Sequence, residues 1–533
     1  MLPYLLLLSL GLFPTVSAYC NPKIYPGPTN NLVCVCNSSC CDELPRIGQL
    51  GVDEAVVIQS SLAGQRFERE TIKFGEAEAT NSASITVDPR LTYQEIYGFG
   101  GAFTDSAGIN FASLSEGSQK KLLEAYFSEN GLEYTIGRVP IASCDFSTRE
   151  YSYLEKAEDY TLSEFKLAEE DHKYKIPYIK KAMELTGGNM VLFASPWSSP
   201  GWMKTTGRMK GTGSLRNDKK VHKAYADYFV RFFEEYRKEG VQFWGATIQN
   251  EPTSGAVPGW KWQTMYFSST GERDFVRYFL GPALASSNIT NRIQLMGLDD
   301  GRIMLPAYAD TMFADEVAKN YVAGMGVHWY GDGYSPAFLL DLAHQRHPDK
   351  FILATEACAG FMVPQGPKMG DWDRAEQYAD SIITNLNHWV TGWTDWNLAL
   401  DLTGGPNWVG NVVDAPIIVN KTADEFYKQP MFYAMGHFSK FLRPGAKRIG
   451  AKTSLEASLF LNVVATNRNA QRSLVILNRH EKTFEDIKIS EESYPGKILT
   501  VTIPPRSITT VIWNKAGSKR KAFSKTGKEE LRA

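Results

Sequence analysis

The chain has 533 residues, of which 12% are aromatic, and a formal net charge of −2 at pH 7. This length exceeds one ordinary domain, so a barrel of typical size leaves roughly 200 residues for other units. A charge this close to zero gives no reason to expect nucleic acid as a partner.

The first 18 residues have the features of a targeting segment. An apolar run from Tyr4 to Leu10 precedes Val16-Ser17-Ala18, which is a small-x-small cleavage pattern. The run is too short to span a bilayer and predicts a secretory signal peptide over 1–18. No later stretch reaches the length of a membrane helix, so we expect a soluble mature protein. Glycosylation in the secretory pathway is compatible with three Asn-X-Ser/Thr sequons, at Asn37, Asn288 and Asn420.

Most of the cysteines lie in the first mature segment, 19–46. They are Cys20, Cys34, Cys36, Cys40 and Cys41. This segment is too small to bury much core, so disulfides would hold it together as a small β flap, and the odd count leaves one cysteine unpaired or bonded elsewhere. A zinc knuckle is the alternative, but no histidine accompanies the cluster and a secretory context favours disulfides. Cys144 and Cys358, beside strand ends, are expected to be buried free thiols.

The rhythm of the sequence changes at about residue 94. Residues 47–93 carry short β-like runs separated by turn residues, whereas strand-like and helix-like patterns alternate afterwards, which indicates a parallel sheet. Eight strand-like runs lie in 94–446, at 97–101, 135–140, 190–194, 243–251, 293–297, 322–327, 351–356 and 392–396. Eight strand–helix units predict an α/β fold, the closed (β/α)8 TIM barrel.

Strand-like runs resume after about residue 450. The segment 447–514 contains three of them and could pair with 47–93 in one accessory β-sandwich assembled from both flanks of the barrel. The last segment, 515–533, is basic and has little apolar content, which predicts a disordered tail; contact with anionic lipid is the alternative.

Two glutamates lie at the ends of predicted barrel strands, Glu251 after the fourth and Glu356 after the seventh. Barrel enzymes build their active sites at this C-terminal face. Two carboxylates held there suit acid–base and nucleophilic chemistry on one bond, above all a glycosidic bond. Either glutamate alone could simply begin a surface loop, but two at equivalent strand ends, with aromatic and amide neighbours, favour a catalytic site.

A series of motifs follows the predicted strands in order. They are Gly98-Phe99-Gly100-Gly101-Ala102, Arg138-Val139-Pro140, Ser143-Cys144-Asp145-Phe146, Ala194-Ser195-Pro196-Trp197, Gln249-Asn250-Glu251-Pro252, Val327-His328-Trp329-Tyr330, Glu356-Ala357-Cys358 and Gly392-Trp393-Thr394-Asp395-Trp396-Asn397. Through them the chain resembles glycoside hydrolase family 30 over nearly all its mature length.

The resemblance implies a glycoprotein that hydrolyses the β-glucosidic bond of glucosylceramide in sphingolipid catabolism. It places the protein in the lysosome, at the lumenal face of the membrane, with secretion as a further possibility. It also implies three kinds of partner: anionic phospholipid, a saposin-type activator and a membrane sorting receptor. The family pattern pairs Cys20 with Cys34 and Cys36 with Cys41, which leaves Cys40 over.

In the family, Glu251 corresponds to the general acid/base and Glu356 to the nucleophile. A glucoside leaves poorly unless its oxygen is protonated, whereas the attacking carboxylate must be ionised. Once Glu356 is esterified its charge disappears, and Glu251 then gives up its proton more readily to serve as the base for water. We predict that the two carboxyl groups lie about 5–5.5 Å apart, since a separation near 9 Å would indicate inversion.

The resemblance also implies a set of residues that bind the glucose, namely Asp145, Trp197, Asn250, Trp396 and Asn411. We expect Asn250 to bond the sugar 2-hydroxyl, with a strand-end cap as the alternative. Tryptophans at strand ends are often core residues, and position near the barrel mouth favours the sugar site for these two.

Three further residues are expected to support the catalytic pair. Arg138 would keep Glu356 ionised, or form a purely structural ion pair. His328 would orient Glu356, or only satisfy backbone groups, and Tyr330 would bond the catalytic carboxylates. No His/Asp/Glu spacing resembles a metal site and no loop suits a phosphate, so we expect neither metal nor cofactor.

Two other functions are compatible with parts of this pattern. One is a different family-30 enzyme, a β-xylosidase or an endo-β-1,6-glucanase, with the same glutamates and other sugar contacts. The other is a non-catalytic sugar- or lipid-binding protein on a barrel scaffold. The loop 360–366 and the stretch around Trp260 and Trp262 are expected to border the mouth, where the chains of a lipid would leave the site.

Overall fold

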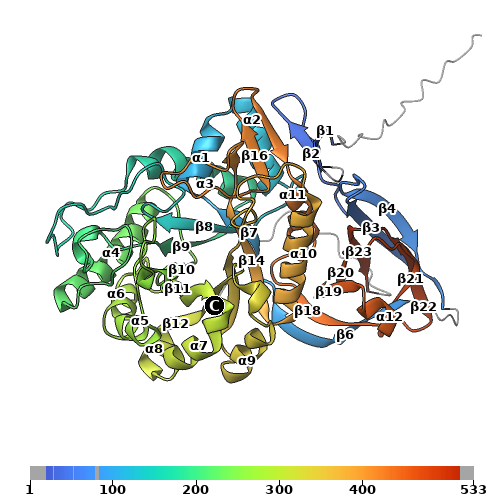
Figure 1. The fold of residues 1–533 in the computed structure, drawn as a ribbon. Helices are drawn as coiled ribbons and strands as arrows, with labels where there is room; N and C mark the ends of the chain where they lie inside the picture. The colour runs from blue at the N-terminus through green and yellow to red at the C-terminus, as the bar shows by residue number, and fades with distance from the viewer. Residues whose placement is uncertain (1–19, 28, 30, 52, 78–82, 516–533) are drawn as a thin grey trace, which may run out of the picture.

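The structure is a computed structural model that describes residues 20–27, 29, 31–51, 53–77 and 83–515. The expected signal peptide at 1–18 and the tail beyond Lys515 lie outside the described residues. Figure 1 shows a barrel on one side and a large β-sheet on the other. Helices α10 (Trp372–Asn387) and α11 (Pro430–Ser439) lie between them and contact both units.

Eight parallel strands close into the barrel in the order β10-β11-β12-β13-β14-β7-β8-β9. They are β7 (Gly98–Ala102), β8 (Ile136–Ile141), β9 (Val191–Pro196), β10 (Gly245–Thr247), β11 (Gln294–Gly301), β12 (Val322–His328), β13 (Phe351–Glu356) and β14 (Val390–Asn397). Their residues are almost all buried, because side chains fill the barrel on one face and helices cover the other. The predicted barrel is confirmed, although β10 is shorter than its apolar run and ends at Thr247.

Amphipathic helices surround the barrel. They are α1 (Asp105–Ala112), α2 (Glu116–Phe127), α3 (Ile176–Leu185), α4 (Lys219–Lys238), α5 (Ser269–Phe275), α6 (Gly281–Ser286), α7 (Leu305–Phe313), α8 (Glu316–Tyr321), α9 (Phe338–Arg346) and α10. In α4 the buried residues Val221, Tyr225 and Phe229 recur every four positions and face the barrel, while the Asp218 side chain caps the first turn. Short helical turns lie in the connections: η1 (Asp171–Lys175), η2 (Gly201–Met203), η3 (Ser254–Ala256), η4 (Val276–Leu280), η5 (Arg302–Met304) and η6 (Asp332–Tyr334).

The second unit is a ten-stranded sheet of order β4-β3-β23-β20-β19-β18-β6-β21-β22-β5. Its strands are β3 (Glu54–Ser61), β4 (Glu68–Lys73), β5 (Gly75–Glu76), β6 (Ser84–Glu95), β18 (Lys447–Thr453), β19 (Leu461–Arg468), β20 (Gln471–Asn478), β21 (Phe484–Glu491), β22 (Lys497–Ile503) and β23 (Ser507–Asn514). Both halves of the sheet contribute to one apolar core, which makes the unit a sandwich. Strands from before and after the barrel pair directly, β3 with β23 and β6 with β18, as predicted.

The sandwich strands next to the barrel bury both of their faces. In β3, Ala55 and Val57 enter the sandwich core, whereas Val56 and Ile58 enter the core of the barrel. In β23, Ile508 and Ile512 likewise pack on the barrel side. Successive side chains of a strand point to opposite faces, so each strand forms part of two cores.

The N-terminal flap is part of a larger sheet rather than a separate unit. Its strands β1 (Pro22–Tyr25) and β2 (Asn31–Cys36) join three strands from the connection after β14, in the order β1-β2-β17-β16-β15. Those three are β15 (Leu400–Asp401), β16 (Ile417–Asn420) and β17 (Glu425–Lys428). The flap contains both implied disulfides, Cys20–Cys34 and Cys36–Cys41, while Cys40 is an exposed free thiol.

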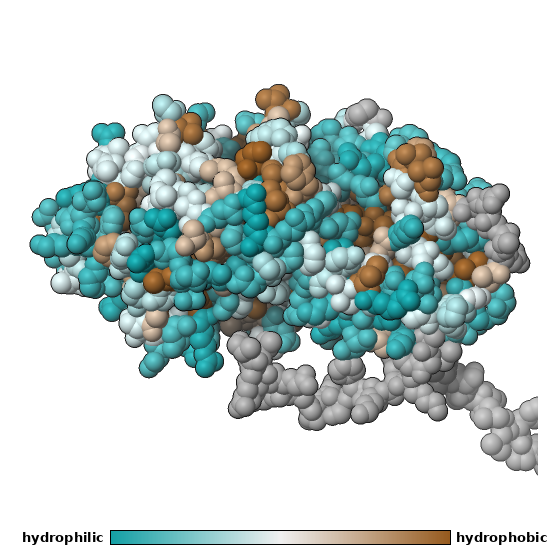
Figure 2. All heavy atoms as spheres, turned by 90° about the horizontal axis from the view of Figure 1, so that it is seen from below, coloured by the Kyte–Doolittle hydropathy of each residue, from teal (hydrophilic) through white to brown (hydrophobic). Residues whose placement is uncertain are grey.

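The surface is mainly hydrophilic on the face shown in Figure 2, where hydrophobic residues form separate small groups. Among the described residues, no helix has the length and apolar character needed to span a membrane. Several large exposed hydrophobic side chains lie in connections that follow barrel strands, namely Val257, Ile303, Tyr334, Phe338, Met362, Val363 and Leu402. We call these residues the apolar rim.

Candidate active site

The barrel brings the two glutamates to one end. Glu356 is the last residue of β13 and is buried, while Glu251 lies four positions after the end of β10. Backbone hydrogen bonds hold the chain to the neighbouring strands across this gap: Asn250 donates its backbone N–H to Pro196 O and Glu251 donates to Asp299 O, both at 2.9 Å. Glu251 has a φ of 44°, a conformation that side chains other than glycine adopt rarely and that is concentrated at functional sites.

The two carboxyl groups lie close together. One carboxylate oxygen of Glu251, one of Glu356 and a ring nitrogen of His328 all lie within 4.8 Å of one another. This is the short spacing of retaining glycosidases, in which the carboxyl groups are about 5–5.5 Å apart. Inverting enzymes separate them by roughly 6.5–9.5 Å to make room for water.

Arg138 on β8 connects the residues at the bottom of the site. It is fully buried and donates hydrogen bonds to Glu356, to Asn250 Oδ1 at 2.8 Å and to Asp299 Oδ2 at 2.8 Å. Its guanidinium also lies 5.0 Å from the ring centroid of Trp197. The arginine therefore contacts the nucleophile position directly and fixes the amide of Asn250, so that its ion pairs are part of the site.

Asp299, at the end of β11, is a functional residue that the sequence reasoning missed. Its carboxylate accepts hydrogen bonds from Arg138, Thr247 and Thr355, at 2.6–2.8 Å, and from the ring of His328 at 3.0 Å. Although burial opposes ionisation, the positive charges of Arg138 and His328 hold the pKa of Asp299 well below its usual range. The available signal was an acid two positions after the predicted strand 293–297, which is similar to the signal that identified Glu251 at the end of the run 243–251.

His328 contacts two carboxyl groups of the site. Its ring nitrogens lie 3.3 Å from Glu251 Oε1 and 3.0 Å from Asp299 Oδ1. Because β12 lies between β11 and β13, His328 pairs with Gly301 on one side and with Glu356 on the other, and its expected role in orienting Glu356 stays a prediction. Burial lowers the pKa of His328, but the charges of Glu356 and Asp299 outweigh burial and raise that pKa to about 10.

Two strong donors converge on Glu356. Arg138 donates to one carboxylate oxygen, and the Tyr330 hydroxyl donates to the other at 2.7 Å. Burial raises the pKa of the Glu356 carboxyl, and the positive charges of Arg138 and His328 oppose that rise. Hydrogen bonds from charged and hydroxyl donors favour the ionised form, so the arrangement suits Glu356 to carry a negative charge.

Asp145 and Asn411 form one polar wall of the site. Asp145 is buried, and its Oδ2 accepts a hydrogen bond from Asn411 Nδ2 at 2.8 Å. Its Oδ1 is buried without a hydrogen-bond partner among the described residues. Burial, together with the charge of Glu356, raises the pKa of Asp145 to about 7. A buried polar atom without a partner costs free energy unless a ligand supplies one, so Oδ1 is suited to accept a sugar hydroxyl.

Trp197 and Trp396 form the adjacent aromatic wall. Their rings stack with centroids 5.0 Å apart, and neither indole N–H has a hydrogen-bond partner among the described residues. Both rings belong to an apolar cluster with Val33 and Val35 of the flap and with the buried thiol Cys358. The flap sheet therefore supports the wall of the site through this cluster.

The described residues contain two groups of possible metal ligands, and neither suits a cation. Cys36 and Cys41 form one with Asp42, but the two thiols are joined in a disulfide. The other combines Glu251, Glu356 and His328, and both ring nitrogens of His328 already contact carboxylates, those of Glu251 and Asp299. Paired carboxyl groups beside polar and aromatic side chains, at the C-terminal face of a barrel, are the arrangement of a glycoside hydrolase.

Two family profiles match the chain. The Glycosyl hydrolase family 30 TIM-barrel domain matches residues 96–442, and the Glycosyl hydrolase family 30 beta sandwich domain matches residues 445–511. The chain belongs to glycoside hydrolase family 30.

Three similar proteins extend this result. The chain is 54% identical to "Putative glucosylceramidase 3" of Caenorhabditis elegans, over 94% of this chain and 96% of that protein. It is 42% identical to "Lysosomal acid glucosylceramidase" of Mus musculus, over 96% of this chain and 99% of that protein. The solved structure of SrfJ from Salmonella typhimurium superposes with a TM-score of 0.80 at 30% identity, covering 87% of this chain and all of that one.

Proposed function

We propose that this protein hydrolyses the β-glucosidic bond of glucosylceramide and releases glucose and ceramide through a covalent glucosyl-enzyme intermediate. The observation that carries the proposal is the close pair of Glu251 and Glu356, with Arg138 and Tyr330 both donating to Glu356. The two relatives at 54% and 42% identity, both called glucosylceramidases, support this choice of substrate.

The proposed first step gives the two glutamates different roles. Two cations, Arg138 and His328, lie beside two carboxylates, Asp299 and Glu356. In this step Glu356 is the nucleophile and Glu251 is the proton donor. Glu356 then attacks the anomeric carbon, the bond from that carbon to the ceramide oxygen breaks, and Glu251 gives its proton to the leaving oxygen.

The second step reverses the roles. Esterification removes the negative charge of Glu356, and Glu251 changes from acid to base. Glu251 takes a proton from water, the water oxygen attacks the anomeric carbon, and the bond to Glu356 breaks. Glucose leaves with its original configuration, and both carboxyl groups return to their starting states.

Several hydrogen-bonding groups of the site have no partner among the described residues and could bond the hydroxyl groups of a glucose ring. Asp145 Oδ1 would accept from a glucose hydroxyl, and the indole N–H groups of Trp197 and Trp396 would donate to others. Because Arg138 occupies Asn250 Oδ1, the Asn250 amide nitrogen is left to donate to the 2-hydroxyl. Asn411 holds Asp145 in place and lies within reach of the same sugar.

The experiment that tests the reaction compares four substrates. We expect hydrolysis of glucosylceramide and of a fluorogenic β-glucoside, with much weaker activity on a β-xyloside and on β-1,6-glucan. A cyclitol epoxide should label Glu356, and peptide mapping locates the adduct. A label on another residue, or a preference for xyloside or glucan, would reject the proposal and favour another family-30 activity.

We further propose that the substrate is reached in a membrane. The apolar rim lies in the connections after strands β10 to β14, at the end of the barrel where the site lies, and Val363 and Met362 in the loop after Glu356 are 93% and 69% exposed. Exposed apolar side chains gathered around a site indicate contact with an apolar partner, here a bilayer with anionic phospholipid and a saposin-type activator. The mouse relative carries "lysosomal" in its name, which supports action in the lysosome. The lumenal face of the lysosomal membrane and delivery by a sorting receptor are part of the same proposal.

A further inference from the structure

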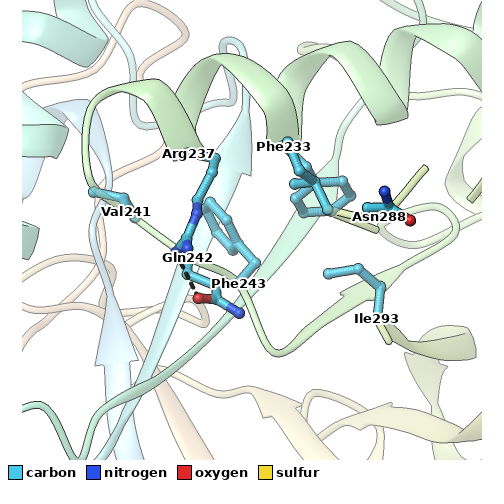
Figure 3. A pocket seen from close by; sticks show the side chains of 8 residues that line it. Phe233, Arg237, Val241, Gln242, Phe243, Asn288 and Ile293 are labelled. Carbon is cyan, nitrogen blue, oxygen red and sulfur yellow. Dashed lines mark hydrogen bonds between the residues drawn. The ribbon is translucent and has the colours of Figure 1, made fainter. Parts of the chain in front are cut away.

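A cavity of about 110 Å³ lies on the side of the barrel away from the catalytic carboxylates (Figure 3). It is formed by the end of α4, by the turn before β10 and by the turn before β11. Its lining residues are Phe233, Arg237, Val241, Gln242, Phe243, Asn288, Ile289 and Ile293. Since the catalytic groups lie at the C-terminal ends of the strands, this cavity opens on the opposite face.

One lining residue is the attachment site of a sequon. Asn288 begins Asn288-Ile289-Thr290, and its exposed side chain has no hydrogen-bond partner among the described residues. Figure 3 places Asn288 on the same side of the cavity as Phe233 and Ile293. Thr290 is buried, and its hydroxyl donates to Leu284 O at 2.7 Å, which fixes the turn that carries Asn288.

The other two sequon amides are engaged in the fold. Asn37 Oδ1 accepts hydrogen bonds from the backbone N–H groups of Ser39 and Cys40, at 2.9 and 3.0 Å. Asn420 Nδ2 donates to the Tyr427 hydroxyl at 2.9 Å. Neither residue lines this cavity, so Asn288 differs from both in having an unengaged amide beside an apolar hollow.

We propose that this cavity binds the first N-acetylglucosamine of an N-linked glycan on Asn288. Its floor of Phe233, Val241 and Phe243 is apolar, as the C–H face of a pyranose requires. Polar groups line its edge, where Arg237 Nη1 donates to Gln242 Oε1 at 2.6 Å and both side chains are exposed. The side chains of Arg237 and Gln242 can form hydrogen bonds with the acetamido and hydroxyl groups of the sugar. The sugar would then fill the cavity and also cover the surrounding surface.

The glycan also covers apolar surface that is otherwise open to water. Ile289 is 41% exposed and Ile293 is partly exposed beside the cavity. A sugar seated between them removes this surface from water, which stabilises the folded state. Because the cavity and the catalytic mouth are on opposite faces, the glycan stabilises the fold without touching the site, and its effect does not depend on which bond the enzyme cleaves.

The test uses the full chain secreted from eukaryotic cells. Mass spectrometry of tryptic glycopeptides should find Asn288 occupied, and Asn288→Gln should lower Tm by roughly 1–3 °C. The matched controls are Ser39→Ala and Thr422→Ala, which remove the other two glycans while Asn37 and Asn420 keep their hydrogen bonds. These controls should leave Tm within 0.5 °C or so of the unmodified protein. An unoccupied Asn288, or equal shifts for all three sequons, would overturn the proposal.

Two further measurements separate a seated sugar from general shielding. An endoglycosidase that leaves one N-acetylglucosamine on each asparagine should preserve the Tm, because only the first sugar occupies the cavity. In an Ile293→Ser background the Tm decrease caused by Asn288→Gln should be half as large or less, because the cavity has already lost part of its apolar contact with the sugar. A Tm that falls on trimming, or an Asn288→Gln effect unchanged by Ile293→Ser, would show that the cavity does not hold the sugar.

Discussion

At the scale of single residues, the division of labour between Glu251 and Glu356 is open to direct test. We expect Glu356→Gln to reduce kcat by about 10⁴-fold or more, because an amide cannot form the glucosyl ester. Glu251→Gln should spare the first step for a dinitrophenyl β-glucoside, whose leaving group needs no proton, and so accumulate the intermediate. Stopped-flow absorbance and mass spectrometry measure both effects. Undiminished turnover by Glu356→Gln, with circular dichroism showing an intact fold, would contradict the assignment.

Asp299 acts through other residues, as a positioning residue. We expect Asp299→Asn to lower kcat about 10–100-fold with a smaller change in KM, because it weakens hydrogen bonds to charged groups. The loss of its negative charge should lower the pKa of His328 and shift the basic limb of the pH–kcat profile to lower pH. The control is Asp310→Asn, an exposed acid paired with Arg346 far from the site. An unshifted profile would indicate a purely structural role.

The sequence identified the glutamates more readily than Asp299, for a physical reason. Glu251 and Glu356 are single acids after apolar runs, whereas Asp299 is followed by a second acid, Asp300. Only the backbone decides which of these two enters the barrel: Leu298 and Asp299 have φ values of 70° and 54°, and the pairing of β11 with β12 shifts register there. Such a local irregularity depends on the closed barrel and is not visible in a one-dimensional pattern.

At the scale of elements, the connections after β10 to β14 carry the apolar rim. We expect the double change Met362→Ser and Val363→Ser to lower hydrolysis of glucosylceramide in phosphatidylserine vesicles about tenfold, because less apolar surface enters the bilayer. Hydrolysis of a soluble fluorogenic β-glucoside should stay within about twofold of the unmodified protein. The matched control is Leu455→Ser with Leu459→Ser, two similarly exposed residues in and directly after α12 (Leu455–Ser458), a short helix of the sandwich. Equal losses on both substrates would argue against membrane contact.

The flap packs against the tryptophan wall of the active site and so can affect sugar binding. Val33 of β2 is fully buried in the cluster that contains Trp197 and Trp396. We expect Val33→Ala to destabilise the fold by about 1–2 kcal/mol and to raise KM for a β-glucoside, because the tryptophan wall loosens. Thermal unfolding and steady-state kinetics measure the two effects. An unchanged KM would show that the flap stabilises the fold without shaping the sugar site.

The pairing partner of the flap could not be read from the sequence. Clustered cysteines indicated a small stapled unit, and the two disulfides agree with that interpretation. However, β2 pairs with β17, whose residues lie almost 400 positions further on. Local composition defines a strand but not a partner so distant, whereas repeated strand–helix alternation does define the barrel, because neighbouring strands there are consecutive in the chain.

At the scale of the whole molecule, buried carboxyl groups make stability depend on pH. Burial raises the pKa of Glu272 to about 8 and that of Asp332 to about 7. A carboxyl with a raised folded pKa contributes stability that is present below its unfolded value and is lost as pH rises through the folded value. We therefore expect a higher Tm at pH 5 than at pH 8. His437, whose pKa burial lowers to about 3, opposes this trend only below about pH 6.5.

The variant Glu272→Gln isolates one of these groups. The amide oxygen can still accept from Leu298 N–H, and the amide nitrogen can donate to the Tyr308 hydroxyl, so packing is kept. The decline in Tm from pH 5 to pH 8 should become smaller by a few degrees, because the variant has no proton to lose. Differential scanning calorimetry across this pH range measures the change. A decline as steep as that of the unmodified protein would show that Glu272 does not contribute.

The shared wall formed by β3 and β23 determines how the two units can be separated. These strands belong to the sandwich, but four of their side chains point away from its core and pack in the core of the barrel unit. They are Val56, Ile58, Ile508 and Ile512. Excising residues 447–514 would strip a hydrophobic surface from the enzyme half and leave it exposed to water. The two units therefore cannot be separated without loss of stability. An engineered version must keep the sandwich, and a chimera made with a relative should take the barrel and the sandwich from the same protein.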